Sequence, residues 1–149
     1  MKTRSSLAFV CTLVMCMSAA ASAPPTRYTI GNTGISQDIA ADNQTGLTWQ
    51  RSFQDQVTYA EADSFCQSLV LGGASDWRLP SIRELVSIVD HTRVVPAIDE
   101  ATFPGTPSLY FWSSTPYVDT PGTMWTIYFG NGGMTGYGGS QKLHVRCVR

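Results

Sequence analysis

The sequence has few charged side chains and few residues of the kinds that form catalytic or metal centres. Only 14% of its 149 residues are charged, the formal net charge is −1, and there are two histidines and four cysteines. The lack of a basic excess argues against nucleic-acid binding. After residue 23 there is no second long apolar run, no low-complexity segment and no internal repeat. The sequence therefore predicts one domain without a membrane span.

The first residues have the pattern of a secretory signal peptide. Lys2 and Arg4 precede an apolar stretch over residues 7–17, and small residues over 18–23 supply a cleavage region, as is typical of export signals. The apolar stretch is too short to anchor the chain across a membrane. We therefore expect the protein to be exported, to the periplasm or to the extracellular space.

The cleavage site sets the boundary of the mature domain. Cleavage after Ala23 fits an Ala-Ser-Ala pattern, and cleavage after Ala21 is the alternative because a proline follows Ala23. With residues 1–23 as the signal peptide, residues 24–149 have the length of one ordinary domain. We expect this single domain to contain one core.

Two segments carry the signals of capped, amphipathic helices. Thr58 stands three residues before Glu61, which is the spacing of a capping box. Ser81 stands in the same relation to Glu84. Apolar residues follow at spacings of three and four, namely Ala62, Phe65, Cys66, Leu69 and Val70 after the first cap and Ile82, Leu85, Val86 and Val89 after the second. We expect the first helix to end before a Gly-Gly pair and the second to run to about Val89.

Other segments alternate between apolar and polar residues, as strands do. They are residues 46–50, 123–129 and 143–147. Trp125 shares the apolar face of the second segment, so we expect its side chain in the core. An Asn-Gly pair at 131–132 favours a tight hairpin turn. We expect the last segment to pair with residues 123–129 and to expose its basic side chains.

The four cysteines predict one disulfide in the mature protein. Cys11 and Cys16 lie in the segment that export removes. Cys66 lies on the apolar face of the first predicted helix, and Cys147 lies on the apolar face of the last predicted strand. Reactive cysteines need exposed, electropositive surroundings. The sequence therefore favours a structural bond between Cys66 and Cys147 over a nucleophile or a redox pair.

An ordered set of motifs resembles the Lcl C-terminal domain family, an exported bacterial family. The motifs are DNQTGLTWQ at 42–50, SDWRLPSIREL at 75–85, YFWSST at 110–115 and VRCVR at 145–149. The resemblance implies a C-type-lectin-like α+β fold, in which two helices pack on small antiparallel sheets. It also implies chain ends that lie close together and a disulfide from the first helix to the last strand, which Cys66 and Cys147 match.

Calcium is not an expected cofactor, although the lectin-like fold makes it a possibility. Calcium-dependent lectins use Glu-Pro-Asn or Gln-Pro-Asp followed by Trp-Asn-Asp, because hard oxygen ligands must share the cation with the sugar. None of these triplets occurs, and residues 113–116 are poor ligands. Asp38, Asp42 and Asn43 offer another oxygen cluster, but an Asp-Asn pair before Thr-Gly is typical of a turn. We expect no metal site and no cofactor.

Aromatic residues set among Ser, Thr, Asn and Gly are the candidate ligand contacts, because they give a large contact area at little entropic cost. Tyr117 and Tyr137 are the ones we expect to be most exposed. The full candidate set is Tyr110, Trp112, Tyr117, Tyr128 and Tyr137.

These features favour a non-catalytic binding or adhesion module that recognises a glycan or an envelope protein without calcium. One alternative is an enzyme of the related formylglycine-generating fold, for which His91 and His144 are too few histidines to form a convincing site. A second is a scaffold that displays variable residues at 110–140. A third is polyanion binding by the last strand, through Lys142, His144, Arg146 and Arg149.

Overall fold

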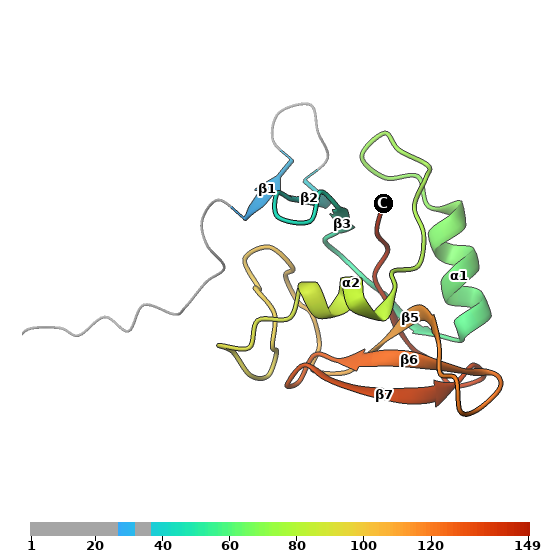
Figure 1. Cartoon of the computed structure of the whole chain (residues 1–149). Coiled ribbons are helices and arrows are strands. Elements are labelled where there is room, and N and C mark those ends of the chain that lie inside the picture. Colours follow the sequence, from blue (N-terminus) through green and yellow to red (C-terminus); the bar gives the residue numbers. More distant parts are fainter. Residues whose placement is uncertain (1–26, 32–36) are drawn as a thin grey trace, which may run out of the picture.

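The computed structural model describes residues 27–31 and 37–149, and it has the predicted α+β class. The predicted signal peptide, with Cys11 and Cys16, lies outside the described residues. The C-type-lectin-like topology remains a prediction of the resemblance. The elements, shown in Figure 1, are β1 (Tyr28–Ile30), β2 (Ile39–Asp42), β3 (Thr48–Gln50), β4 (Gln54–Val57), α1 (Tyr59–Ser68), α2 (Ile82–Ser87), β5 (Tyr110–Pro116), β6 (Thr123–Tyr128), β7 (Gly133–Gly138) and β8 (Leu143–Val145).

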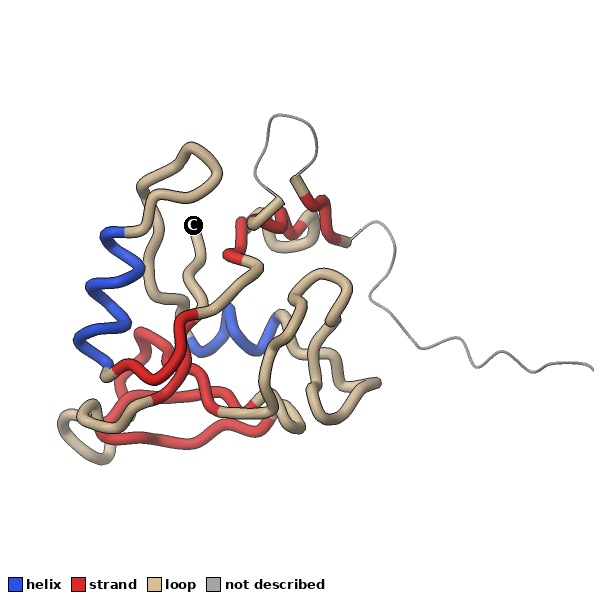
Figure 2. Tube along the Cα trace, turned by 180° about the vertical axis from the view of Figure 1, so that it is seen from behind, coloured by secondary structure: helices blue, strands red, loops and turns tan. Residues whose placement is uncertain are grey.

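The strands form two sheets with a helix on each side of the larger one. β1, β2 and β3 form an antiparallel sheet, and the second sheet has the order β4-β8-β5-β6-β7. Neighbouring residues of a strand point to opposite faces. Phe111 of β5 packs in one cluster with Leu85 of α2, whereas Trp112 packs in another with Cys66 of α1. Figure 1 shows α2 over the β5–β7 strands, and Figure 2 shows both helices from behind.

The pairing that we predicted for the last strand is wrong. β8 lies between β4 and β5, and it pairs with β5 in parallel through Phe111 and His144. β6 is flanked by β5 and β7 instead. The predicted turn at 131–132 is present, and the glycine-rich stretch after it forms β7. Because a short hairpin joins β6 to β7, β7 occupies the edge of β6 that the last strand would have needed.

Both predicted capping boxes are confirmed. The Thr58 hydroxyl accepts a hydrogen bond from the Glu61 N–H at 3.4 Å. The Ser81 hydroxyl accepts one from the Glu84 N–H at 3.3 Å. α2 ends at Ser87, slightly earlier than predicted, because the next residue leaves helical geometry and bonds back across a tighter turn. The two helices therefore begin where the sequence places them.

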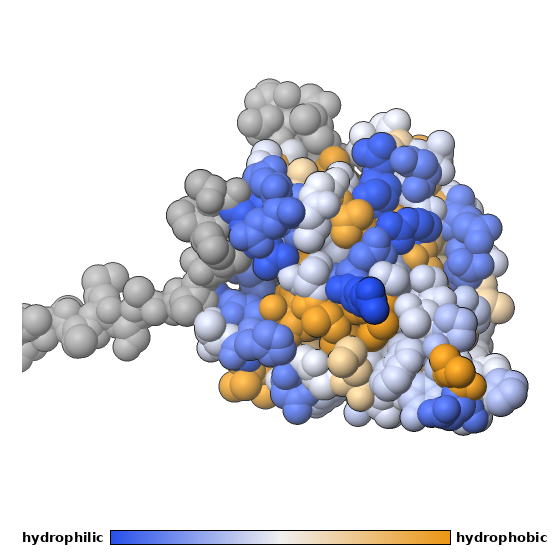
Figure 3. All heavy atoms as spheres, in the orientation of Figure 1, coloured by the Kyte–Doolittle hydropathy of each residue, from blue (hydrophilic) through white to orange (hydrophobic). Residues whose placement is uncertain are grey.

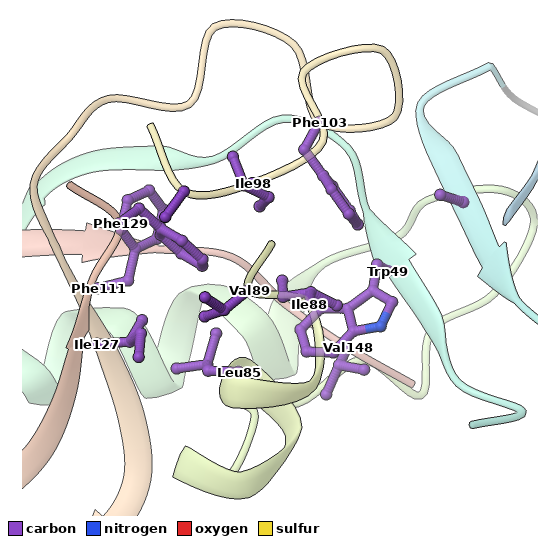
Figure 4. Packing of buried hydrophobic residues seen from close by; sticks show 12 residues of the cluster. Trp49, Leu85, Ile88, Val89, Ile98, Phe103, Phe111, Ile127, Phe129 and Val148 are labelled. Atoms are coloured by element: carbon purple, nitrogen blue, oxygen red, sulfur yellow. The ribbon is translucent and has the colours of Figure 1, made fainter. Parts of the chain in front are cut away.

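The predicted disulfide is also present. Cys66 of α1 is bonded to Cys147, and the two Cα atoms lie 5.5 Å apart. The bond lies in a buried cluster that also contains Ala62, Trp77, Leu79, Trp112, Met124 and Val145. On the other face of the sheet, the larger cluster in Figure 4 contains Ala40, Trp49, Leu85, Ile88, Val89, Ala97, Ile98, Phe103, Phe111, Ile127, Phe129 and Val148.

Candidate functional site

Three half-buried tyrosines from neighbouring strands form a cluster, which we call the tyrosine platform. They are Tyr110 of β5, Tyr128 of β6 and Tyr137 of β7. The ring centroid of Tyr110 lies 4.8 Å from that of Tyr128 and 4.8 Å from that of Tyr137. Tyr110 and Tyr128 are also direct partners in the β5–β6 register. The structure thus brings together three of the five predicted ligand contacts.

Small residues let the three rings converge. Thr126 lies on the same face of β6 as Tyr128, two positions earlier. It is fully buried, and its hydroxyl donates to the Thr135 carbonyl at 2.9 Å. Next to the platform, a Cβ at Gly130 would collide with the Tyr128 ring. A larger side chain at either position would displace the rings.

The platform includes one phenol, that of Tyr110, whose pKa is shifted by its surroundings. Burial raises the pKa of Tyr110 above its ordinary value, and the neighbouring Tyr137 raises it further, both electrostatically and through a side-chain hydrogen bond. The Tyr110 phenol therefore keeps its proton near neutral pH and can donate as well as accept a hydrogen bond. Flat apolar rings edged by such hydroxyls suit a ligand that has both an apolar face and polar groups around it.

On the opposite face, α2 and the β6–β7 hairpin enclose an apolar groove of about 380 Å³. Figure 3 shows the hydrophobic surface between α2 and β6. The lining residues are Ile82, Arg83, Val86, Trp125 and Met134. The sequence does not predict this groove, because Ile82 and Val86 have the spacing of ordinary core-facing helix residues and Met134 stands in a glycine-rich stretch.

Two aromatic predictions require correction on this face. Tyr117 lies with the groove and not with the platform, because its ring packs 4.6 Å from the Trp125 ring centroid and covers Gly136. Its ring is half-buried, as is that of Tyr137 on the platform face, since each packs against another ring. Trp125, predicted to be in the core, is half-buried and lines the groove because the short α2 covers only part of this face.

Trp112 cannot contact a ligand as predicted. Its side chain is 0% exposed, and its indole N–H donates to the Val57 carbonyl at 2.8 Å. Its ring also packs edge-on against Tyr59 of α1, with 6.0 Å between the centroids. Trp112 therefore belongs to the interior on the disulfide side of the sheet.

Two of the four predicted polyanion contacts are buried. His144 is 5% exposed and Arg146 is 0% exposed, because β8 lies inside the sheet and both of its faces are covered. Lys142 and Arg149 are exposed, and Arg149 is paired with Asp76 at 2.7 Å. The prediction of one exposed basic face on the last strand is therefore wrong.

Arg146 is an interior cation with a structural role. Its guanidinium lies 4.6 Å from the Phe103 ring centroid. It donates to the Thr106 hydroxyl at 2.7 Å and to the carbonyls of Arg51 and Ser52 at 3.2 and 3.3 Å. Burial lowers the pKa of Arg146 to about 9, so the group remains charged near neutral pH and holds the chain that follows β3 against the sheet.

Asp42, one of the residues considered for a metal, is engaged elsewhere. Arg27 donates to Asp42 Oδ2 at 3.0 Å, and the Gln44 N–H donates to Asp42 Oδ1 at 3.0 Å. Burial opposes the ionisation of Asp42, but these hydrogen bonds outweigh it and lower the pKa of the carboxyl. Within residues 27–31 and 37–149, no group of three or more His, Cys, Asp or Glu side chains is placed to hold a metal ion.

Comparison with known families matches residues 38–149 to the Lcl C-terminal domain. The match covers most of the chain and includes both helices, the disulfide and all three tyrosines of the platform. No curated protein matches the chain. In the part of the chain that the structure describes, no helix is long and apolar enough to cross a membrane.

Proposed function

Since this chain belongs to the Lcl C-terminal domain family, we propose that it is an exported, non-catalytic binding module that recognises a glycan through the tyrosine platform. The observation that carries the proposal is the convergence of Tyr110, Tyr128 and Tyr137 on one face of the sheet. The disulfide supports export, because such bonds persist in oxidising compartments.

The chemistry of the platform fits a sugar ring. The apolar C–H face of a sugar packs against aromatic rings, and the hydroxyls at its rim need hydrogen-bond donors and acceptors, which tyrosine hydroxyls supply. Because the rings come from three adjacent strands and pack on one another, little side-chain entropy is lost when a ligand binds. Binding to a protein surface is the alternative that the same residues allow.

The platform needs no calcium for this contact. The ligand groups are phenols and rings, and Asp42, one of the candidate cation ligands in the sequence, is held by Arg27. We therefore propose calcium-independent recognition, in contrast with lectins in which the cation bridges protein and sugar.

The positions of the sulfur and imidazole groups support a non-catalytic role. A formylglycine-generating type of reaction needs free reactive thiols, and Cys66 and Cys147 are bonded to each other. His144 is stacked on Phe111 and hydrogen-bonded to Asp55 at 2.8 Å. These groups are engaged in holding the fold.

A glycan array tests the proposal with the mature, oxidised domain in calcium and in chelator. We expect chelator-resistant binding that is lost in Tyr110→Ala and Tyr137→Ala. Tyr117→Ala is the matched control, because this tyrosine lies on the opposite face, and it should retain binding. Thermal unfolding of each variant shows that it is folded. A blank array from folded protein, a strict need for calcium, or unchanged binding in both platform variants would overturn the proposal.

A further inference from the structure

The outer edge of the large sheet is open at β7. β7 is the last strand in the order β4-β8-β5-β6-β7, and every one of its residues from Gly133 to Gly138 is paired with β6 without a bulge. In an antiparallel pair, residues alternate between those that bond to the partner strand and those that point their backbone groups away. The open edge is therefore defined by every second residue of β7.

The register identifies these residues. The Gly139 N–H donates to the Gly122 carbonyl at 2.9 Å, and the same ladder continues into the β6–β7 register. Tyr137 and Thr135 thus direct their backbone groups to β6, and the Gly133 N–H donates to the Asn131 side chain at 2.9 Å. Met134, Gly136 and Gly138 point their N–H and C=O groups outward. The Gly138 carbonyl accepts a turn bond from the Gln141 N–H at 3.0 Å. Among the described residues, the outward groups of Met134 and Gly136 have no partner.

The edge lacks the features that usually prevent pairing with another chain. Natural edge strands carry lysine, proline or a bulge, each of which blocks or repels an incoming strand. β7 has the sequence Gly-Met-Thr-Gly-Tyr-Gly, with no charge and no proline. Two of its three outward-pointing residues are glycines, so β7 carries no side chain of its own at these positions, and the Tyr117 ring covers Gly136 from the groove face only.

The apolar groove adjoins this edge and supplies a charge. Met134 belongs to both and is 52% exposed. Arg83 lines the groove from α2 and is exposed. In the described part of the chain, every other arginine donates a side-chain hydrogen bond, and Arg83 alone does not. The groove therefore offers apolar contact together with an uncompensated positive charge.

We propose that the β7 edge binds an extended peptide segment of a partner protein as a sixth strand, with apolar side chains in the groove and an acidic side chain at Arg83. Backbone hydrogen bonds to Met134 and Gly136 would supply affinity, and the groove would select the side chains that point toward it. This site goes beyond the glycan proposal, because it lies at the edge and on the face opposite the platform and takes a different class of ligand.

The chemistry of the peptide follows from the pleat of the sheet. Every second residue of an added strand points to the groove face, so apolar residues are expected at alternate positions. Met134 and Trp125 provide adaptable and aromatic surfaces for these side chains. One Asp or Glu among them would pair with the guanidinium of Arg83. A uniformly basic or proline-rich segment would not meet these requirements.

A phage-displayed library of random peptides, panned on the folded wild-type domain and counter-selected on Met134→Lys, tests the proposal. We expect enriched sequences that alternate apolar residues and contain Asp or Glu. A synthetic copy of the leading peptide should slow hydrogen exchange at the Met134 and Gly136 amides. Its affinity should fall at least about tenfold in Met134→Lys and in Arg83→Glu. Val70→Lys, which alters an exposed apolar residue after α1, should bind as wild type does.

The opposite results overturn the proposal. One is that no peptide is enriched on the folded wild-type protein. Another is that an enriched peptide binds but does not slow hydrogen exchange at the Met134 or Gly136 amide. The last is that hydrogen exchange at these amides slows with protein concentration when no peptide is present. The last result would mean that a second copy of the chain occupies the edge. Tyr110→Ala should retain peptide binding, because Tyr110 lies on the platform. The experiment therefore distinguishes failure of the peptide proposal from failure of the glycan proposal.

Discussion

The two faces of the β5–β6–β7 strands both carry aromatic residues but are supported differently. On the α1 face, a disulfide joins the helix to the chain end, and three tyrosines pack on one another beyond the helix. On the α2 face, a six-residue helix leaves Trp125 half-buried beside an open groove. One face presents a closely packed ring cluster, and the other presents a hollow.

The difference underlies the two kinds of recognition that we propose. Rings that are fixed by their neighbours favour a ligand of defined shape, because little ordering is needed on binding. A groove that includes a flexible methionine can adapt to different apolar side chains. The same three strands thus support a rigid contact surface on one side and an adaptable one on the other, and the following changes test that comparison.

The largest effect should come from the disulfide on the α1 face. The double variant Cys66→Ala with Cys147→Ala should lose about 4.5 kcal/mol of unfolding free energy, because the bond closes a loop between residues separated by 81 positions. Denaturant unfolding measures the loss, and a thiol assay should find no free cysteine in the oxidised wild-type protein. Unchanged stability in the double variant would show that packing alone holds this face.

The next largest effect should come from the packing of α2. Leu85 is fully buried in the cluster between α2 and the sheet. Leu85→Ala should cost about 3 kcal/mol of unfolding free energy, since it removes buried methyl groups and leaves a cavity. Arg83→Ala, an exposed change on the same helix, should cost almost nothing. Equal stability of the two variants would contradict the assignment of the core-facing side of α2.

The α2 face should also be the more sensitive to acid. Arg78 hydrogen-bonds to Glu84 at 2.6 and 2.9 Å and lowers the pKa of that carboxyl to about 2. The folded state therefore keeps Glu84 charged at a pH where the unfolded chain is already protonated. The resulting stability, about 2 kcal/mol, is present above pH 4.5 and is lost as the pH falls toward 2.

Glu84→Gln isolates this contribution. The difference in unfolding free energy between wild type and variant should be largest near pH 7 and should shrink toward pH 2, as measured by denaturant unfolding at a series of pH values. A difference that does not change with pH would mean that the Arg78 contact contributes no charge-dependent stability.

The smallest effect should come from the cap of α1. Thr58→Ala removes the hydroxyl that accepts from the Glu61 N–H, and it should cost about 1 kcal/mol. Thr58→Ser keeps the hydroxyl and should cost less than half of that amount. Equal losses in both variants would attribute the effect to side-chain packing and not to the hydrogen bond.

The sequence predicts local features well and long-range coverage poorly. The two caps depend on residues three positions apart, and the disulfide follows because only Cys66 and Cys147 lie beyond the predicted signal segment. Alternation along β8 correctly distinguishes its two faces. It cannot show that β8 lies between two other strands, or that other parts of the chain cover both faces. His144 and Arg146 are therefore buried against expectation. No local pattern predicts how short α2 is, so the sequence does not reveal that Trp125 is only half-buried.

The most direct test of the platform is a two-dimensional NMR titration of the mature domain in the presence of chelator. The titrant is a glycan to which the domain binds on the array. The account predicts that shift changes gather at Tyr110, Tyr128 and Tyr137, while the signals of Trp125 and Met134 stay in place. Changes that gather at Trp125 and Met134 and spare the tyrosines would contradict it, because the glycan would then occupy the groove on the opposite face.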